Sequence, residues 1–230
     1  MRKKLLSTFI GLFLFGSASV YAQFSRPISV GAGTGATFNL TDLGNVESKF
    51  AFYGELDYLI TPYISVGLHG EKSTLGGNGY ESEFKNRYFA GNLNGKVRLG
   101  QFLDHSNNYS YYTLGANTFS RILSNIYVGA GAGLVKNRIV RKLDPRYADA
   151  IVNQGGELAE DLGEIHFVIP LNVGVDIPFG RTLYGPQWAI NVNYQHTLTT
   201  NDNLDGIINR NNDQYGFVSV GLKYALFNRK

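Results

Sequence analysis

The chain has 230 residues, no cysteine, and 21 Lys and Arg residues against 18 Asp and Glu residues. The lack of cysteine excludes disulfides, cysteine-ligated metal sites and an N-terminal lipid anchor of the lipoprotein kind. The small basic excess indicates no nucleic-acid partner, because three of the basic residues, at positions 2–4, belong to a segment that we expect to be removed from the mature protein.

The first 22 residues have the three parts of a secretory signal peptide. Basic residues 2–4 precede an apolar run over residues 5–15, and Val-Tyr-Ala at positions 20–22 gives the small-x-small pattern that a signal peptidase cuts. The apolar run is shorter than the roughly 20 residues that a membrane-spanning helix needs. We therefore expect cleavage before Gln23 and a mature domain of residues 23–230.

Eight segments of the mature part alternate apolar with small or polar residues at period two, the spacing of side chains on the two faces of a β-strand. In the last segment, Val218, Val220 and Leu222 fall on one face while Ser219 and Gly221 fall on the other. The segments comprise residues 28–40, 49–60, 64–71, 89–99, 126–140, 166–177, 188–195 and 218–226.

No stretch after the signal peptide is apolar enough for a spanning helix, so strands must make any membrane crossing. The pattern predicts an all-β fold, an eight-stranded antiparallel up-and-down transmembrane β-barrel whose apolar faces meet lipid. A water-soluble, ligand-carrying barrel would instead bury its aliphatic side chains inside.

The connections between these segments should alternate between longer outer loops and shorter inner turns. The polar outer loops are expected at residues 41–48, 73–83, 141–163 and 200–213, and the inner turns at residues 61–63 and 178–186. Within the sixth segment, Pro170 cannot donate a backbone hydrogen bond, and a closed barrel has no free edge to place it on. We expect a β-bulge there.

The inner connection over residues 100–124 is unusually long. It carries Leu114, Phe119, Ile122 and Leu123 at roughly helical spacing, and tyrosines within 107–112 at strand spacing. It forms either a short helix packed under the barrel or an extra hairpin that makes ten strands. We favour eight strands, because residues 107–112 lack the apolar length of a lipid-facing strand. The length of the connection also suggests a docking site for a periplasmic partner.

Six charged residues fall on the lumen-facing positions of the even-numbered segments, near the end at which those segments reach the periplasm. They are Glu55, Asp57, Lys96, Arg98, Asp176 and Lys223. Glycines of the odd-numbered segments leave room for these long side chains, and a barrel of about eight strands is just wide enough to be filled by side chains. Because the acidic and basic residues balance, we interpret the six as a structural, salt-bridged plug. The alternative is a gate that breaks to admit water and ions.

Candidate enzymatic and metal sites are poorly supported. The histidines at 69, 105, 166 and 196 are scattered, with no metal-ligand spacing. His196 lies where lipid A deacylases of the outer membrane hold a catalytic histidine, but those enzymes have serine two residues later, and here Leu198 stands there. Residues 201–206 resemble the start of a calcium loop, but Asn212 replaces its bidentate glutamate. We expect no enzyme, no cofactor and no metal.

Aromatic residues near the strand ends predict two interfacial girdles. Those expected at the inner girdle are Tyr58, Trp188 and Tyr224, and those expected at the outer girdle are Phe38, Tyr194 and Tyr215.

The end of the chain resembles the β-signal by which outer-membrane proteins are recognised by their assembly machinery. The residues that match this signal are Ser219, Gly221, Tyr224, Leu226 and Phe227. With the preceding Asn-Leu-Asp-Gly at 203–206 and Asn-Asp-Gln-Tyr at 212–215, the mature chain resembles the OmpA-type barrel proteins of Bacteroidota outer membranes.

This resemblance implies a small barrel in the outer membrane of a Gram-negative bacterium, with no residue-level active site. The implied partners are outer-membrane lipids and lipopolysaccharide, the barrel assembly machinery during insertion, and, as a further candidate, a periplasmic or membrane protein. Family members often continue into a peptidoglycan-binding domain, which residues 23–230 do not imply. We expect a structural or surface-interaction role; the alternatives are a narrow gated channel for small solutes or ions and, last, a lipid A-modifying enzyme.

Overall fold

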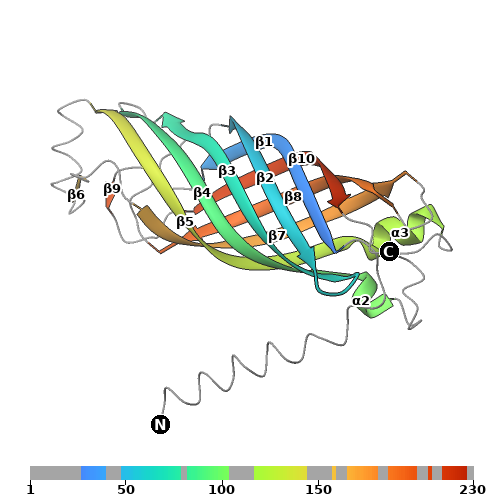
Figure 1. Cartoon of the computed structure of the whole chain (residues 1–230). Coiled ribbons are helices and arrows are strands. Elements are labelled where there is room, and N and C mark those ends of the chain that lie inside the picture. The colour runs from blue at the N-terminus through green and yellow to red at the C-terminus, as the bar shows by residue number, and fades with distance from the viewer. Residues whose placement is uncertain are drawn as a thin grey trace, which may run out of the picture.

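The period-two segments form strands that close on themselves. The computed structural model describes residues 27–39, 48–78, 82–103, 117–143, 157–158, 165–180, 186–200, 207–208 and 214–226. The barrel strands are β1 (Ile28–Asn39), β2 (Ser48–Leu59), β3 (Ile64–Asn78), β4 (Ser82–Arg98), β5 (Ile126–Leu143), β7 (Ile165–Phe179), β8 (Trp188–Thr199) and β10 (Gln214–Leu226). They form one closed antiparallel barrel in the order β1-β10-β8-β7-β5-β4-β3-β2 (Figure 1).

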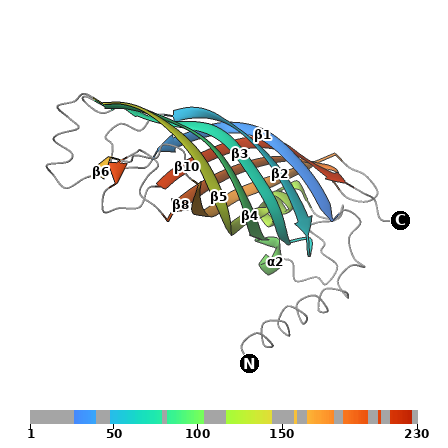
Figure 2. The ribbon, with the colours of Figure 1, turned by 60° about the vertical axis from the view of Figure 1, so that its left-hand side comes forward.

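The predicted eight-stranded barrel is confirmed, and the ten-stranded alternative is wrong. Each barrel strand already pairs with two others, and β10 closes the sheet by pairing with β1. Outside the barrel, β6 (Glu157–Leu158) pairs with β9 (Ile207–Ile208), which joins the segment before β7 to the segment before β10. This small pair lies at the end of the barrel opposite the helices (Figure 2).

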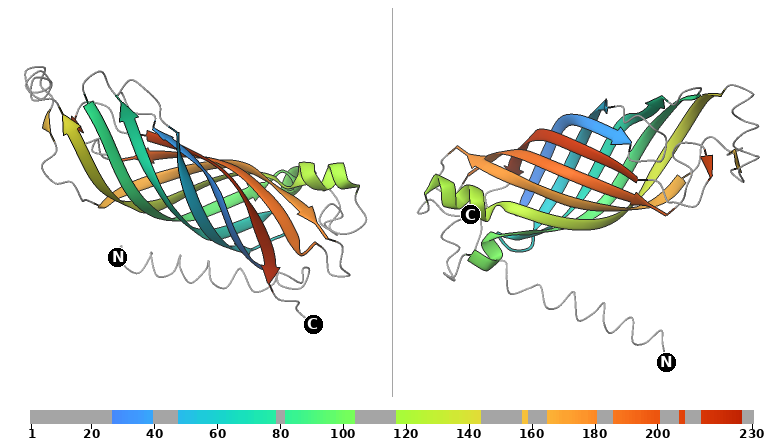
Figure 3. Two further views of the ribbon diagram at one scale, coloured as in Figure 1. Left: turned by 90° about the horizontal axis from the view of Figure 1, so that it is seen from above. Right: turned by 180° about the vertical axis from the view of Figure 1, so that it is seen from behind.

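The strands are strongly tilted because their register is staggered. If the paired residues are followed once around the barrel from Ile28, the path returns to β1 at Phe38, ten residues further along the strand. Such a stagger requires the strands of a small barrel to tilt by about 35–45° from its axis. The tilt is visible in both views of Figure 3.

Side chains alternate between the two faces of this wall, as the sequence predicts. On β3, Leu68 is 58% exposed on the outside, while its neighbour His69 is 8% exposed in the lumen. The lumen is narrow, and glycines allow it to be filled: a β-carbon on Gly67 would collide with the carboxylate of Asp57, and one on Gly131 would collide with the side-chain amide of Asn94.

The β-bulge expected at Pro170 is wrong. The register between β7 and β8 runs without offset through Pro170, which pairs with Thr197. On the other side of β7, the pairs with β5 end at Leu171 and resume at Val168 in the same register. The missing N–H of proline is therefore accommodated by a local gap in pairing, with no inserted residue.

Two short helices lie between β4 and β5, at the end of the barrel that also holds the β2–β3 turn (Figures 1 and 3). They are α2 (Gly100–Leu103) and α3 (Thr118–Ser124). The Asn117 side chain caps α3 by accepting a 2.7 Å hydrogen bond from the backbone N–H of Ser120. The short helix predicted for this connection is present, and it ends against β7, where the Asp176 N–H donates to the Asn125 carbonyl. No helix in the described part of the chain is long and apolar enough to cross a membrane.

Candidate functional site

The structure brings all six predicted lumen charges into one buried cluster, which we call the lumen charge cluster. Its members are Glu55, Asp57, Lys96, Arg98, Asp176 and Lys223, and each is at most 7% exposed. They come from β2, β4, β7 and β10, the strands that run toward the α2/α3 end, and each stands near the end of its strand.

Lys223 joins the three carboxylates of the cluster. Its Nζ lies 3.0 Å from Glu55 Oε1, 3.0 Å from Asp57 Oδ2 and 3.1 Å from Asp176 Oδ1. A buried carboxylate is costly unless it is paired, so one ammonium group here satisfies three carboxylates from two strands. Lys223 therefore holds β2, β7 and β10 together across the lumen.

Lys96 and Arg98 complete the charge balance. Lys96 Nζ lies 2.7 Å from Glu55 Oε2 and 3.1 Å from Asp57 Oδ2. Arg98 Nη2 donates to Asp176 Oδ2 at 2.8 Å, and its Nη1 donates to the Ser65 hydroxyl. The cluster thus divides into an Arg98–Asp176 pair at one side and a Lys96-centred pair of carboxylates at the other, with Lys223 bridging both.

Tyr127, which was not predicted as part of the site, places its ring among the three cations. Lys96 Nζ is 5.5 Å, Lys223 Nζ 5.7 Å and Arg98 Cζ 6.0 Å from the ring centroid. A ring face attracts cations, and more strongly where water is excluded. The signal was present, because Tyr127 shares the face of Gly129, but glycine dominated the interpretation of that strand.

A layer of asparagine side chains lies next to the lumen charge cluster, on the side toward the middle of the barrel. Tyr127 Oη donates to Asn193 Oδ1 at 3.0 Å, and Asn193 Nδ2 donates to Asn172 Oδ1 at 3.2 Å. Asn191 Nδ2 contacts both Tyr127 Oη and Asp176 Oδ1, at 2.9 and 2.8 Å. Amides can donate and accept at once, so this layer continues the hydrogen-bond network of the charges toward the middle of the barrel.

Apolar and aromatic side chains occupy the half of the lumen away from α2 and α3. The buried cluster there, which we call the outer apolar cluster, comprises Leu75, Tyr88, Ala90, Val135, Val168 and Tyr215. Below it, Glu71 accepts hydrogen bonds from Tyr88 Oη at 2.9 Å and Gln195 Nε2 at 3.0 Å. The prediction that Tyr215 belongs to the outer girdle is wrong, since its position has the parity of the buried Phe217 and its side chain is fully buried.

The remaining girdle residues do lie on the outer wall. Trp188 packs against Tyr224 with ring centroids 4.6 Å apart, and Phe38 stacks on Tyr194 at 6.3 Å. These two pairs stand toward opposite ends of their strands, as interfacial aromatic residues do in membrane barrels.

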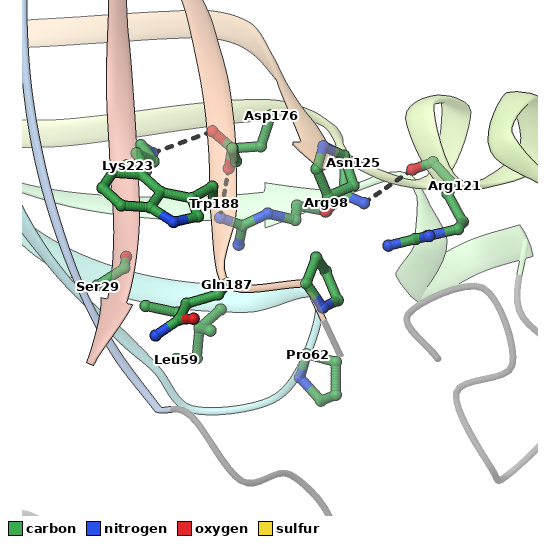
Figure 4. A pocket seen from close by; sticks show the side chains of 14 residues that line it. Ser29, Leu59, Pro62, Arg98, Arg121, Asn125, Asp176, Gln187, Trp188 and Lys223 are labelled. Atoms are coloured by element: carbon green, nitrogen blue, oxygen red, sulfur yellow. Dashed lines mark hydrogen bonds and ion pairs between the residues drawn. The ribbon is translucent and has the colours of Figure 1, made fainter. Parts of the chain in front are cut away.

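A cavity opens at the α2/α3 end of the lumen (Figure 4). It has a volume of about 70 Å3, and Arg98, Asp176 and Lys223 form its inner wall. Arg121 of α3 and Asn125, which follows the helix as its C-cap, contribute to the rim, where Asn125 Nδ2 donates to the Arg121 carbonyl at 2.7 Å. Drug-sized ligands occupy cavities of about 300–1,000 Å3, so this one suits water and small ions at most.

In the part of the chain that the structure describes, the other candidate sites assemble no catalytic or metal-binding group. His196 is half-buried on the outer wall, with Nδ1 3.2 Å from Tyr194 Oη and Nε2 3.0 Å from Gln214 Oε1. Among the described residues no group of three His, Cys, Asp or Glu side chains could hold a metal ion. His105 and residues 201–206 lie outside the described residues.

The residues of the assembly-signal motif lie on β10, except Phe227, which is outside the described residues. Ser219 and Lys223 face the lumen, and Val220 and Leu222 are about half exposed on the outside. Position 221 requires glycine because Tyr53 and the backbone of β1 approach it closely. A β-carbon there would collide with both.

The sequence matches no protein-family model and no curated protein. Among solved structures, the chain is similar to Ail, the attachment invasion locus protein of Yersinia pestis, with a TM-score of 0.50 and 10% identity over 88% of this chain and 100% of that one. Neisserial surface protein A gives a TM-score of 0.49 and 12% identity, covering 89% of this chain and 100% of that one. The N-terminal β-barrel domain of Pseudomonas aeruginosa OprF gives 0.36 and 10%, covering 87% and 99%. The fold is that of the small eight-stranded outer-membrane barrels.

Proposed function

We propose that the chain is an integral barrel of the outer membrane of a Gram-negative bacterium, with a closed lumen and a structural or surface-interaction role. Its task would be to hold the connections at the β6/β9 end at the cell surface. The observation that supports this proposal best is the reversed distribution of side chains, apolar outside and charged inside.

The apolar side chains form a belt around the whole barrel. Every barrel strand carries at least one large apolar residue that is 40% or more exposed, for example Val30 on β1, Phe89 on β4 and Val220 on β10. Soluble monomers rarely expose contiguous apolar patches larger than a few hundred Å2. A belt that surrounds the molecule fits a hydrocarbon environment, in which every strand contacts lipid.

A gated channel is the second candidate, because the cavity in Figure 4 leads from the inner mouth to the lumen charge cluster. However, ions that cross the lumen would also have to pass a second barrier. The outer apolar cluster closes the opposite half of the lumen, with Leu75 and Val135 at most 1% exposed. Breaking the ion pairs alone would leave that barrier intact, so we favour a closed barrel.

Two further parts of the proposal concern biogenesis. We expect the signal peptide to be removed before Gln23 and the barrel assembly machinery to recognise Ser219, Gly221, Tyr224, Leu226 and Phe227. The intact mass of protein purified from outer membranes should correspond to residues 23–230. A Tyr224→Ala, Phe227→Ala variant should insert more slowly than wild type while still folding in detergent, with a stability loss of about 0.5–1.5 kcal/mol from the lost Trp188–Tyr224 ring contact.

Partners follow from this location. Lipids and lipopolysaccharide would cover the belt, and the α2/α3 connection faces the side on which a periplasmic partner would dock. Site-specific crosslinking from Phe102 and Phe119, which are 68% and 74% exposed, would identify such a partner. Crosslinks only to lipid or within the chain would exclude it.

The experiment that decides the main proposal combines solubility with conductance. The mature protein should require detergent to stay monodisperse and should give near-zero conductance in planar bilayers. A monodisperse sample in plain buffer would contradict the membrane assignment, whereas steady single-channel currents from the wild type would replace the closed barrel with the channel. Lipid A mass profiles of cells carrying wild type or His196→Ala should be identical, and a difference would revive the enzymatic alternative.

A further inference from the structure

The outward-facing surface of β3, β4 and β5 carries four cations in one group. Lys72 on β3, Arg87 on β4, and Lys136 and Arg138 on β5 are all exposed, while those of their sequence neighbours whose side chains the structure describes are buried in the lumen. Lys72 pairs with Phe89, which pairs with Lys136, and Arg87 pairs directly with Arg138. The three strands lie side by side (Figures 1 and 2), so the four side chains occupy neighbouring positions of one surface.

No acidic side chain balances these four cations among the described outward-facing residues. Wherever the structure describes outward-facing side chains of the barrel, these four are the charged ones, and all four are positive. None of them forms an ion pair with a described residue. A cation on the lipid face costs about 2–4 kcal/mol at the bilayer midplane and close to nothing at the interface. Four cations together therefore indicate that this surface lies at the level of the lipid headgroups. Because all four are positive, the headgroups that they contact should be anionic.

A hollow lies directly below these cations, toward the middle of the strands. Its floor is a row of glycines in register across three strands, since Gly54 pairs with Gly70 and Gly70 pairs with Gly91. Leu56, Leu68 and Leu93 form its lower side. Outward residues on a strand follow each other at about 6.6 Å, so one row without side chains leaves a groove about one hydrocarbon chain wide.

The barrel itself does not need these glycines. A β-carbon on Gly91 would meet no atom within 4 Å, and one on Gly54 or Gly70 would meet none closer than 3.9 Å. The glycines that face the lumen differ, because a β-carbon at Gly33 or Gly131 would collide with the neighbouring strand to which its own strand is paired. Glycine weakens a strand and buries no apolar surface, so a row of glycines on the outside favours an external occupant.

We propose that this surface binds a phosphorylated lipid of the outer leaflet, with its phosphates on Lys72, Arg87, Lys136 and Arg138 and one acyl chain in the glycine groove. The inference rests on the proposed membrane location and goes beyond it. Cations and groove are arranged as headgroup and chain are in a lipid, with Lys72 two residues above Gly70 on β3. A second copy of the barrel fits less well, because a symmetric contact would bring eight like charges together.

The test uses the mature protein in nanodiscs of a zwitterionic lipid with a small fixed fraction of lipopolysaccharide. Bound lipid is measured by native mass spectrometry and by competition with a fluorescent lipopolysaccharide. The same measurement with chemically dephosphorylated lipopolysaccharide, and with inorganic phosphate as competitor, separates the headgroup from the acyl chain and from free phosphate.

Two variants act on the two halves of the site. K72Q/R87Q/K136Q/R138Q should lower the affinity for lipopolysaccharide at least about tenfold and abolish the preference over the dephosphorylated form, since each basic residue near an anionic surface contributes appreciably. G70L/G91L should weaken both forms by about threefold or more. The matched controls are K72R/K136R, which keeps the charge, and G95L, which adds the same side chain on the outside of β4 away from the groove.

Four outcomes would overturn the inference: an unchanged preference in the neutralised variant, equal loss in G95L and G70L/G91L, competition by millimolar inorganic phosphate, or a change of oligomeric state with no change in bound lipid. If the barrel inserts into nanodiscs but shows any of these outcomes, the proposed function stands and the proposed lipid site is rejected. Failure of the wild type to enter nanodiscs would instead remove the membrane location, and the lipid site with it. All substituted side chains are on the surface, so R87Q/R138Q alone provides a milder variant if the quadruple change impairs folding.

Discussion

Lys223 on the last strand and Asp57 on the second are 166 positions apart in sequence, and their side chains form a buried ion pair of 3.0 Å. The strands that carry them, β10 and β2, are both neighbours of β1. The pair therefore reaches across the inside of the first strand at the place where the barrel closes, and it can form only when closure is complete.

Removing one member of this pair should be more harmful than removing both. Lys223→Met leaves the carboxylates with one cation too few, and an uncompensated buried charge costs about 3–5 kcal/mol. Lys223→Met with Asp57→Asn restores neutrality, so the double variant should lose clearly less free energy of unfolding than the sum of the single losses. Urea unfolding in lipid vesicles, followed by tryptophan fluorescence and by heat-modifiable gel mobility, measures all three.

A double-mutant cycle on these values gives the coupling directly. Strictly additive losses would mean that Lys223 and Asp57 do not share a charge balance, and the ion-pair description of the cluster would have to be abandoned. The control is Lys136→Met in vesicles of a zwitterionic lipid only, where no anionic lipid occupies the outer surface; it should change the free energy of unfolding by less than about 0.5 kcal/mol.

Tyr127 should contribute to stability through its ring as well as through its hydroxyl. Tyr127→Phe keeps the face toward Lys96 and Lys223 but removes the hydrogen bonds with Asn191 and Asn193, at an expected cost of about 1–2 kcal/mol. Tyr127→Leu also removes the ring and should cost about 1–2 kcal/mol more, because the cations lose a favourable surface in a desolvated place. The same unfolding measurement applies; equal losses in the two variants would assign the whole effect to the hydroxyl.

The predictable part of the site is the part that side-chain parity determines. Glu55, Asp57, Lys96 and Arg98 share the lumen parity of their strands, and antiparallel order brings the same ends of alternate strands together. Their meeting could therefore be expected from the sequence. Tyr127 was missed because the glycines beside it suggested an empty face, although it shares that face.

Two errors have different causes: in one the parity was not applied, and in the other its signal fades. Tyr215 was assigned by its place near a strand end, although its position relative to Val218 puts it in the lumen. Leu75 was expected in a loop, whereas β3 continues to Asn78. Beyond the membrane, strands can keep pairing with water on their outer side, so the apolar half of the alternation fades there and the outer apolar cluster has no clear sequence signal.

The lumen should conduct only when both of its barriers are weakened. Asp57→Ala disturbs the lumen charge cluster, and Leu75→Ala with Val135→Ala opens space in the outer apolar cluster. Each change alone should leave planar-bilayer conductance near zero, and the triple variant should give measurable currents. Current from Asp57→Ala alone would show that the ion pairs are the sole gate. A silent but folded triple variant would mean that the asparagine layer between them also seals the lumen.

Replacing glycine by valine should have opposite effects on stability on the lumen face and on the outer face of the barrel wall. Gly131→Val on β5 puts a branched side chain against Asn94 and the backbone of β4, so we expect a loss of several kcal/mol or failure to fold. Gly95→Val on β4 points outward, where a β-carbon meets only the Ala130 carbonyl at 3.9 Å. Because valine is a better strand residue than glycine and would contact lipid, this variant should be as stable as wild type or more stable by up to about 1 kcal/mol. Heat-modifiable mobility and urea midpoints of the two variants, measured side by side, check the assignment of inside and outside. Equal destabilisation of both would mean that the outer wall at Gly95 is packed against something other than lipid.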